Sequence, residues 1–318
     1  MTLYLDDDDV ASLLPMEVAI TSVERAFRLL SDGTALNEVR HRTHADGAVL
    51  NVMWALAPEV GVLGVKAYPV VRQDVTQGSE LTVLLYSAQS GALLAVLKGD
   101  KLGQLRTGAA SAVASRTLAR EGAKTLTVFG TGYQALSQVL AHTASVPTLE
   151  SVRVVGRSPA RRDAFIDHVR DLVCVDVEAA RPETAAASAD IVVTATGSAT
   201  PVLHGGRVKP GAHVNAIGSN TAAKRELDRT MLERCSVIAV DDPTVANQES
   251  GDLIANAWDP LAVVALGDIL TARTTVRRGV DDITLFESHG LAVQDVVCAA
   301  VVYERALDAG RGRRIRQP

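Results

Sequence analysis

A glycine-containing turn at residues 130–135 is the part of this chain whose chemistry can be read most directly. The apolar run 126–129 leads into Gly130-Thr-Gly132-Tyr-Gln-Ala135, and a helix-forming segment follows. In that order the first glycine permits a tight turn out of a strand, the second lets backbone approach a pyrophosphate, and the alanine lets a helix pack closely on the sheet. The turn therefore predicts a dinucleotide site; a turn rich in glycine for conformational reasons alone is the alternative. The predicted cofactor-binding residues in it are Gly130, Thr131, Gly132, Tyr133 and Gln134.

The second apolar run ends without an acidic residue, which bears on the choice of cofactor. Residues 152–155 are followed by Gly156-Arg157-Ser158, roughly 20 residues after the glycine turn, where a Rossmann fold reads the ribose. An NAD-specific site usually places there an acid that accepts from the ribose 2′-OH and repels a 2′-phosphate. Arg157 can instead face a phosphate through its planar donors, and Ser158 can add a hydroxyl. We therefore predict a preference for NADP(H), with NAD(H) possible; a solvated surface arginine is the alternative.

Arginines and an acid in the next segment bear on the same prediction. Arg161 and Arg162 raise the local positive potential, and the first acid, Asp163, lies inside the following helix-forming segment.

Ligands of open α/β sheets bind outside the carboxyl ends of the strands, so the loops at 196–198 and 217–220 also belong to the predicted site. From these loops we predict that Thr196, Gly197 and Ile217 bind the cofactor.

These loops contain no clear acid, base or nucleophile, so catalytic groups must come partly from the first part of the chain. Lys66 lies within an otherwise apolar run, and Arg106 lies at the start of an alanine-rich helix. A cation in an apolar setting needs a partner, and a substrate carboxylate would serve; an internal salt bridge is the alternative. His41 and His44 lack a third ligand at useful spacing, and we predict no metal site.

Two regions with different hydrophobic patterns must position these residues. An amphipathic helix over 15–31 precedes four strand-like runs between residues 47 and 98, and their close spacing implies antiparallel pairing. After the alanine-rich helix at 104–119, short apolar strands alternate with helices, which is typical of a parallel, doubly wound sheet. A final helix over 292–307 returns to the first domain.

The predicted fold is therefore α/β, with a Rossmann-type doubly wound sheet plus an α+β substrate-binding and dimerisation domain. The Rossmann domain is expected at residues 119–291, and the second domain at 1–118 with 292–318. Apolar residues on both faces of the strand-like runs leave more hydrophobic surface than one layer of helices covers, which predicts a homodimer. The acidic run Asp6–Asp9 is expected to open a helix, with a cation site as the alternative, and the tail from Gly310 is expected to fray.

Composition bounds the class of protein. The chain has 318 residues, of which 47% are hydrophobic and 22% charged, and a net charge of -5 without a basic block argues against nucleic acid or an anionic membrane as a partner. Cys174, Cys235 and Cys298 are far apart and form no disulfide framework. Neither a signal peptide nor an apolar run of ~18 residues is present, so we expect a cytoplasmic protein.

Several ordered motifs carry a resemblance to a known family. They are Gly64-Val-Lys66, Leu105-Arg106-Thr-Gly-Ala-Ala-Ser-Ala, the glycine turn, Lys209-Pro-Gly-Ala-His-Val-Asn215-Ala-Ile-Gly-Ser, Arg225-Glu-Leu-Asp228, Glu249-Ser-Gly-Asp252 and Thr284-Leu-Phe-Glu-Ser288-His-Gly290. With them the chain resembles, nearly end to end, the ornithine cyclodeaminase/mu-crystallin family, which includes archaeal-type alanine dehydrogenases and cyclic ketimine reductases. The resemblance implies a homodimer whose antiparallel-sheet domain holds the substrate carboxylate with Arg40, Lys66 and Arg106. The last motif adds Ser288 and Gly290 to the predicted cofactor-binding residues.

Departures from the family pattern bear on the activity. Cyclodeaminases of the family carry a glutamate in the first sheet and an aspartate after the Asn-Ala-x-Gly strand, where this chain has Asn51 and Asn220. The second ammonium group of ornithine needs an anion, and asparagine offers none and is no base near neutrality. Glu80 could take the place of the carboxylates that this chain lacks. The segment 50–53 and the box 249–252 look more like mu-crystallin, a ketimine reductase.

The leading hypothesis is therefore an NAD(P)H-dependent oxidoreductase that reduces a small imine, a cyclic ketimine or imino acid, bearing an adjacent carboxylate. Arg106, Arg40 and Lys66 would orient the carboxylate, and Asn220 could hydrogen-bond the nitrogen. Two alternatives stay open: an ornithine cyclodeaminase-type ammonia-lyase with bound NAD, and a non-catalytic, crystallin-like protein that binds NADP(H) or a small ligand.

Overall fold

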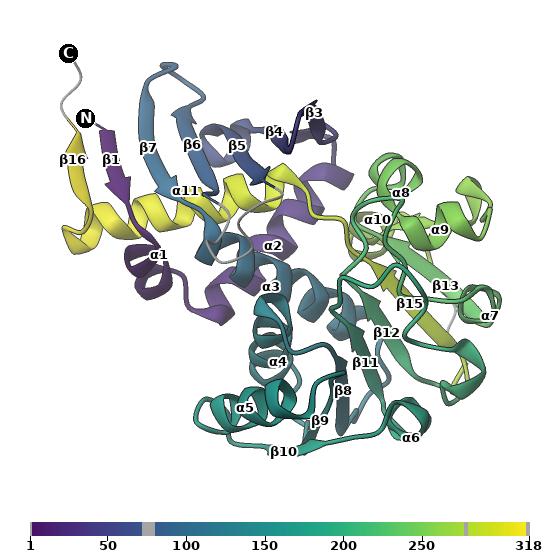
Figure 1. Cartoon of the computed structure of the whole chain (residues 1–318). Coiled ribbons are helices and arrows are strands. Elements are labelled where there is room, and N and C mark those ends of the chain that lie inside the picture. Colours follow the sequence, from purple (N-terminus) through teal and green to yellow (C-terminus); the bar gives the residue numbers. More distant parts are fainter. Residues whose placement is uncertain (1, 72–79, 277–278, 316–318) are drawn as a thin grey trace. The chain divides into compact units, whose positions relative to one another are not determined.

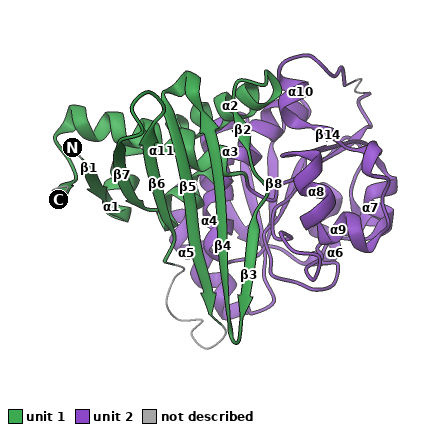
Figure 2. Cartoon of the chain, turned by 90° about the horizontal axis from the view of Figure 1, so that it is seen from above, with its two compact units in different colours: residues 1–106, 291–318 green, residues 107–290 purple. Residues whose placement is uncertain are grey.

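The chain divides into two compact units (Figures 1 and 2). The computed structural model describes residues 2–71, 80–276 and 279–315. Unit 1 comprises Met1–Arg106 with Leu291–Pro318, and unit 2 comprises Thr107–Gly290. The first boundary follows Arg106 and so falls within helix α3 (Asp100–Leu118). The sequence predicts this boundary after Leu118, the last residue of the same helix. One continuous helix thus contributes to both units.

Unit 1 is built on a mixed sheet with the strand order β16-β1-β7-β6-β5-β4-β2, in which β3 also pairs with β4. The strands β4 to β7 pair antiparallel, as their close spacing predicted, and β1 joins β7 in parallel. The strands are β1 (Thr2–Leu5), β2 (Leu36–Asn37), β3 (His41–Ala45), β4 (Ala48–Ala57), β5 (Val62–Val71), β6 (Thr82–Ser87), β7 (Leu93–Lys98) and β16 (Arg313–Ile315).

Helix α11 packs against one face of this sheet, and helix α2 packs against α11. Gly64 on β5 allows close approach, because a Cβ there would lie 2.5 Å from Cγ2 of Val296 on α11. Val62, Gly64 and Lys66 alternate along β5 and are buried on this face. Lys66 is thereby directed at α11. The helical segments of unit 1 besides α3 are α1 (Asp7–Leu13), α2 (Met16–Ser31), the 3₁₀ turn η1 (Pro58–Val60) and α11 (Ala292–Ala309).

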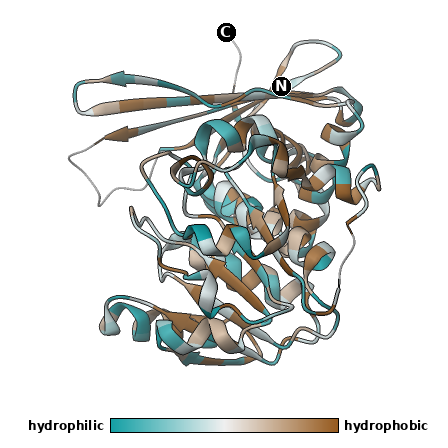
Figure 3. Ribbon diagram, turned by 90° about the vertical axis from the view of Figure 1, so that its right-hand side faces the viewer, coloured by the Kyte–Doolittle hydropathy of each residue, from teal (hydrophilic) through white to brown (hydrophobic). Residues whose placement is uncertain are grey.

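The opposite face of the sheet carries a row of apolar side chains. Trp54, Val65, Leu84 and Val96 are neighbours across β4, β5, β6 and β7, and all four are only partly buried. Figure 3 views these strands edge-on and shows how much of their ribbon is hydrophobic.

The tail from Gly310 contains a strand, so the prediction of a frayed tail was wrong for residues 313–315. These residues form β16, which satisfies the edge of β1, and Arg313 lies over the Tyr4 ring at 4.9 Å. The acidic run opens a helix as predicted, because the Asp6 side chain caps α1 by accepting from Asp9 N at 2.9 Å. The carboxylate of Asp9 also pairs with Arg311 at 3.3 Å.

Unit 2 contains a fully parallel sheet with the order β10-β9-β8-β11-β12-β15-β13-β14. From β10 to β12 this is the 3-2-1-4-5 order of a Rossmann fold, as predicted. The strands are β8 (Thr125–Phe129), β9 (Ser151–Val155), β10 (Asp176–Ala179), β11 (Ile191–Thr194), β12 (His213–Ala216), β13 (Cys235–Val240), β14 (Val264–Ala265) and β15 (Ile283–Glu287).

Two apolar cores cover the two faces of this sheet. Helices α4 and α5 contribute to one core and α6 to α9 to the other, which makes the sheet doubly wound. The helices are α4 (Tyr133–Ser145), α5 (Pro159–Arg170), α6 (Pro182–Ser188), α7 (Arg229–Glu233), α8 (Pro243–Glu249), α9 (Gly251–Ala255) and α10 (Leu266–Leu270), with 3₁₀ turns η2 (Gly205–Arg207) and η3 (Pro260–Ala262). Across the described ranges, no helix is long and apolar enough to cross a bilayer.

Candidate functional site

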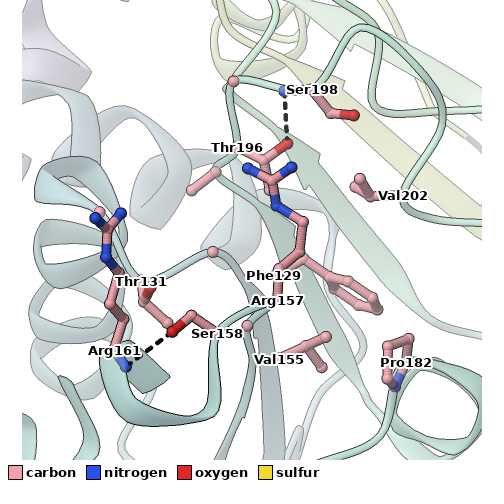
Figure 4. A pocket seen from close by; sticks show the side chains of 15 residues that line it. Phe129, Thr131, Val155, Arg157, Ser158, Arg161, Pro182, Thr196, Ser198 and Val202 are labelled. Carbon is pink, nitrogen blue, oxygen red and sulfur yellow. Dashed lines mark hydrogen bonds between the residues drawn. The ribbon is translucent and has the colours of Figure 1, made fainter. Parts of the chain in front are cut away.

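Unit 2 holds a cavity of about 710 Å³ at the carboxyl ends of β8, β9 and β11 (Figure 4). This is where a Rossmann sheet binds its ligand, and the volume is that of an ordinary small-molecule site. The lining residues are Phe129–Gly132, Val155–Ser158, Arg161, Pro182, Ala195–Ser198 and Val202.

The glycine turn has the geometry that a dinucleotide requires. Gly130 has φ +123°, and a Cβ there would lie 2.4 Å from the Ala195 carbonyl oxygen, so the strand can leave the sheet only through glycine. Gly132 caps α4 without a side chain, and a Cβ built on it would meet no described heavy atom within 4 Å. Packing within the chain gives no reason for glycine at that position, whereas close approach of a pyrophosphate to the helix N-terminus does. The residues present therefore fit a nicotinamide dinucleotide.

Seven of the predicted cofactor residues line this cavity: Gly130, Thr131, Gly132, Arg157, Ser158, Thr196 and Gly197. Tyr133, Gln134, Ile217, Ser288 and Gly290 lie outside the lining. Ile217 is buried in the core beside α4 and α5. The Ser288 hydroxyl and the Gly290 N–H both donate to Asp241, at 3.0 and 2.8 Å. These two residues thus hold the loop after β15.

The end of the cavity beyond β9 is positively charged, and none of the lining residues is an Asp or Glu. Arg157 and Arg161 are exposed, and neither guanidinium makes an ion pair with any residue that the structure describes. Arg162 contributes less than the sequence suggested, because it pairs with Asp163 at 2.9 Å. Two arginines, rather than three, therefore remain available to an anion at this end.

A second cluster of charged residues lies in unit 1. Asp295 on α11 accepts from Lys66 Nζ through both carboxylate oxygens at 3.0 Å and from Arg106 Nε at 3.1 Å. Gln294 accepts from Arg106 Nη1 at 3.1 Å. Arg40 belongs with them, because its charge lowers the pKa of Lys66, and its Nε donates to Met53 Sδ at 3.3 Å. We call these residues, Arg40, Lys66, Arg106, Gln294 and Asp295, the cation cluster.

Burial controls the charge state of Lys66. The side chain is 3% exposed, and burial, followed by the charge of Arg106, lowers the pKa of Lys66 from 10.5 to about 8. Asp295 opposes that shift and Arg40 adds to it. The ammonium is therefore charged at neutral pH but close to its titration point.

The cation cluster explains why Lys66 and Arg106 tolerate burial. The salt bridge that the sequence left open as the alternative to a substrate site exists, but in it Lys66 and Arg106 share the single carboxylate of Asp295. A further anion, such as a substrate carboxylate, would balance the remaining charge. Sequence reasoning missed Asp295, although a carboxylate inside the apolar run 292–302 was a signal that it has a buried partner.

The remaining predicted residues lie elsewhere. Asn51 is buried and its Nδ2 donates to the Tyr68 carbonyl at 3.4 Å, and Asn220 lies in unit 2 on the loop after β12. Glu80, which the sequence offered as a replacement for the missing cyclodeaminase carboxylates, pairs with Lys98 at an exposed position. His41 stacks on Trp54. No group of three His, Cys, Asp or Glu side chains that could hold a metal occurs in the described part of the chain.

Comparison with known proteins adds the family. The model of the ornithine cyclodeaminase/mu-crystallin family matches residues 2–310. The chain belongs to this family. It is 36% identical over 273 residues to the Delta(1)-pyrroline-2-carboxylate reductase of Bacillus cereus, covering 83% of each chain. It is 34% identical over 227 residues to the ketimine reductase mu-crystallin of Mus musculus, covering 71% of this chain and 69% of that one.

A solved structure in the family resembles the whole chain. The Thermococcus litoralis Delta(1)-pyrroline-2-carboxylate reductase, in complex with NADH and L-proline, matches with a TM-score of 0.93 and 29% identity. The match covers 98% of this chain and 100% of that one. The family and the fold expected from the sequence motifs are thereby confirmed.

Proposed function

We propose that this protein is an NAD(P)H-dependent reductase of small imines, cyclic ketimines or imino acids, that carry a carboxylate next to the C=N carbon. The observation that carries the proposal is the cation cluster, in which two buried cations share one carboxylate. The family relatives that reduce pyrroline-2-carboxylate and ketimines support the same chemistry.

The substrate carboxylate would bind to Lys66 and Arg106, with Arg40 as a third contact. Asp295 holds two of these groups before substrate arrives, so little side-chain freedom is lost on binding. A charge-assisted hydrogen bond to each cation would fix the orientation of the imine. Asn220 could hydrogen-bond the imine nitrogen from the loop after β12.

The cavity of unit 2 would hold the cofactor, with the glycine turn and the start of α4 at the pyrophosphate. A bound nicotinamide supplies the hydride that reduces the C=N carbon. Arg157, with Ser158 and Arg161 beside it, would face a ribose 2′-phosphate. The end of β9 carries no acidic residue that would repel this phosphate. We therefore propose a preference for NADP(H) over NAD(H), with cofactor specificity set by Arg157.

The partly exposed apolar face of the unit 1 sheet is proposed to pair with a second copy of the chain. The row formed by Trp54, Val65, Leu84 and Val96 would be removed from water in a homodimer. We also place the protein in the cytoplasm, on the dispersed cysteines of the sequence.

The cyclodeaminase alternative is disfavoured by the contacts of its key positions. Asn51 is an amide that donates to backbone, and Glu80 pairs with Lys98, so neither provides an anion for a second ammonium group in the cation cluster.

The experiment that tests the proposal measures NADPH and NADH oxidation with cyclic ketimine carboxylates, pyruvate plus ammonia, and an iminosuccinate-like compound. Oxidation that requires the carboxylate supports the proposal; cofactor binding without turnover of any imine would favour the non-catalytic alternative.

A further inference from the structure

Two of the motifs that carry the family resemblance contribute neither to the cofactor cavity nor to the cation cluster. Arg225–Asp228 and Glu249–Asp252 are both in unit 2, and each provides a fully buried carboxylate, Glu226 and Asp252. A buried carboxylate is costly unless several donors meet it. The contacts of these two carboxylates therefore indicate what each motif does.

Glu226 joins two loops at the carboxyl edge of the sheet. Its Oε1 accepts from the N–H and the hydroxyl of Thr196 at 2.7 and 2.6 Å. Its Oε2 accepts from the hydroxyl of Thr194 and the N–H of Gly218, both at 2.8 Å. One carboxylate thus binds the loop after β11, which lines the cofactor cavity, to the loop after β12.

Asp252 fixes the backbone that carries Glu226. Its Oδ1 accepts from the N–H groups of Glu226 and Leu227 at 2.8 and 2.7 Å. The box that contains Asp252 packs tightly on the same segment, because a Cβ on Gly251 would lie 1.8 Å from the Lys224 carbonyl oxygen. The Glu226 carboxylate therefore has little freedom to move away from its four donors.

The two loops also pack closely against each other and against Glu226. A Cβ on Gly218 would lie 2.1 Å from the Thr196 carbonyl oxygen and 2.6 Å from the Glu226 carboxylate. Thr196 in turn accepts from Ser198 N at 3.3 Å, so the cavity-lining segment 196–198 is tied to Glu226 through one side chain (Figure 4).

We propose that Glu226 is a positioning residue for the cofactor: it holds the segment 196–198 in the conformation that binds the dinucleotide, and Asp252 supports it. The chemistry requires a carboxylate, because all four partners donate. A glutamine would turn its amide NH₂ toward the N–H of either Thr196 or Gly218 and so lose the hydrogen bond to one of the two loops. The inference rests on the proposed cofactor cavity.

The test compares Glu226→Gln with Glu233→Gln, which makes the same change at an exposed position of unit 2. NADPH affinity is measured by fluorescence titration, and hydrogen exchange is followed in the peptides that contain 195–198 and 217–218. We expect Glu226→Gln to raise the Kd for NADPH about ten- to a hundredfold, as loss of charged hydrogen bonds does, and to speed exchange in both peptides. Glu233→Gln should match the wild type.

A second variant keeps the test decisive if Glu226→Gln does not fold. Thr194→Val removes one hydroxyl that donates to Glu226 and lies outside the cavity lining, and we expect a smaller change of the same sign in both measurements. A lower melting temperature with unchanged NADPH affinity and unchanged exchange would overturn the inference, since it would leave Glu226 a structural role alone. Failure of the wild type to bind NADPH or NADH would instead reject the cofactor cavity itself.

Discussion

Replacement of Asp295 by asparagine tests the cation cluster most sharply. The change is isosteric and leaves Lys66 and Arg106 without the carboxylate that both contact at 3.0–3.1 Å. Removing one partner of a buried ion pair costs about 3–5 kcal/mol. We therefore expect the free energy of unfolding to fall by about this amount at pH 6, where both cations are charged.

The pH dependence follows from the pKa of Lys66. In the wild type burial lowers this pKa from 10.5 to about 8, so between those pH values the unfolded state binds more protons and this group adds stability as pH rises. Asp295 raises the pKa of Lys66, so Asp295→Asn lowers it below about 8. The loss of stability should then be smaller at pH 9 than at pH 6, because Lys66 is neutral at the higher pH.

Steady-state kinetics report the same shift. Lys66 must be charged to bind a substrate carboxylate, so kcat/KM for the imine should decline above about pH 8 in the wild type and at lower pH in Asp295→Asn. Asp308→Asn, at an exposed position on α11, is the matched control and should change neither profile. A wild-type pH profile retained in Asp295→Asn, or equal destabilisation at pH 6 and pH 9, would refute the reasoning.

Three further predictions follow from the two units. Lys66→Ala and Arg106→Ala should each lower kcat/KM for the imine about ten- to a hundredfold with the Kd for NADPH unchanged. Unchanged kinetics would show that the two residues form only a structural salt bridge with Asp295. Arg157→Ala should weaken binding of NADPH much more than that of NADH in calorimetric titrations, and equal effects would remove Arg157 from the 2′-phosphate site. Light scattering should give a dimer mass at micromolar concentration and a monomer for Leu84→Glu on the outer sheet face; a monomeric wild type would contradict the proposed interface.

Local patterns predicted much of the fold. The strand–glycine turn–helix of residues 126–145 and the alternation of short strands with helices depend on neighbours in sequence, so both could be identified. The residues of β15 were recognised only as part of the motif 284–290, because a five-residue strand flanked by turns carries no periodic signal of its own. β16 was missed since its pairing with β1 joins the two ends of the chain.

The part of the candidate site that depends on neighbours in sequence was predictable, and the part that depends on distant contacts was not. The glycine turn and Arg157 follow directly from strand ends, and the structure places them around one cavity. The link between Lys66 and Asp295 spans 229 residues, and the helix that carries Asp295 reaches β5 only because Gly64 gives it room. The roles of Glu226 and Asp252 likewise depend on contacts between loops that no local pattern specifies.

The central claim is that a carboxylate-bearing imine is reduced by net hydride transfer. The most direct measurement incubates the enzyme with Δ1-pyrroline-2-carboxylate and NADPH deuterated at the transferable C4 position, and analyses cofactor and product by mass spectrometry. We predict one NADPH oxidised for each proline formed, with one deuterium at the former imine carbon. No oxidation with this or other ketimine carboxylates, together with release of ammonia from ornithine without net change in the cofactor, would contradict the account.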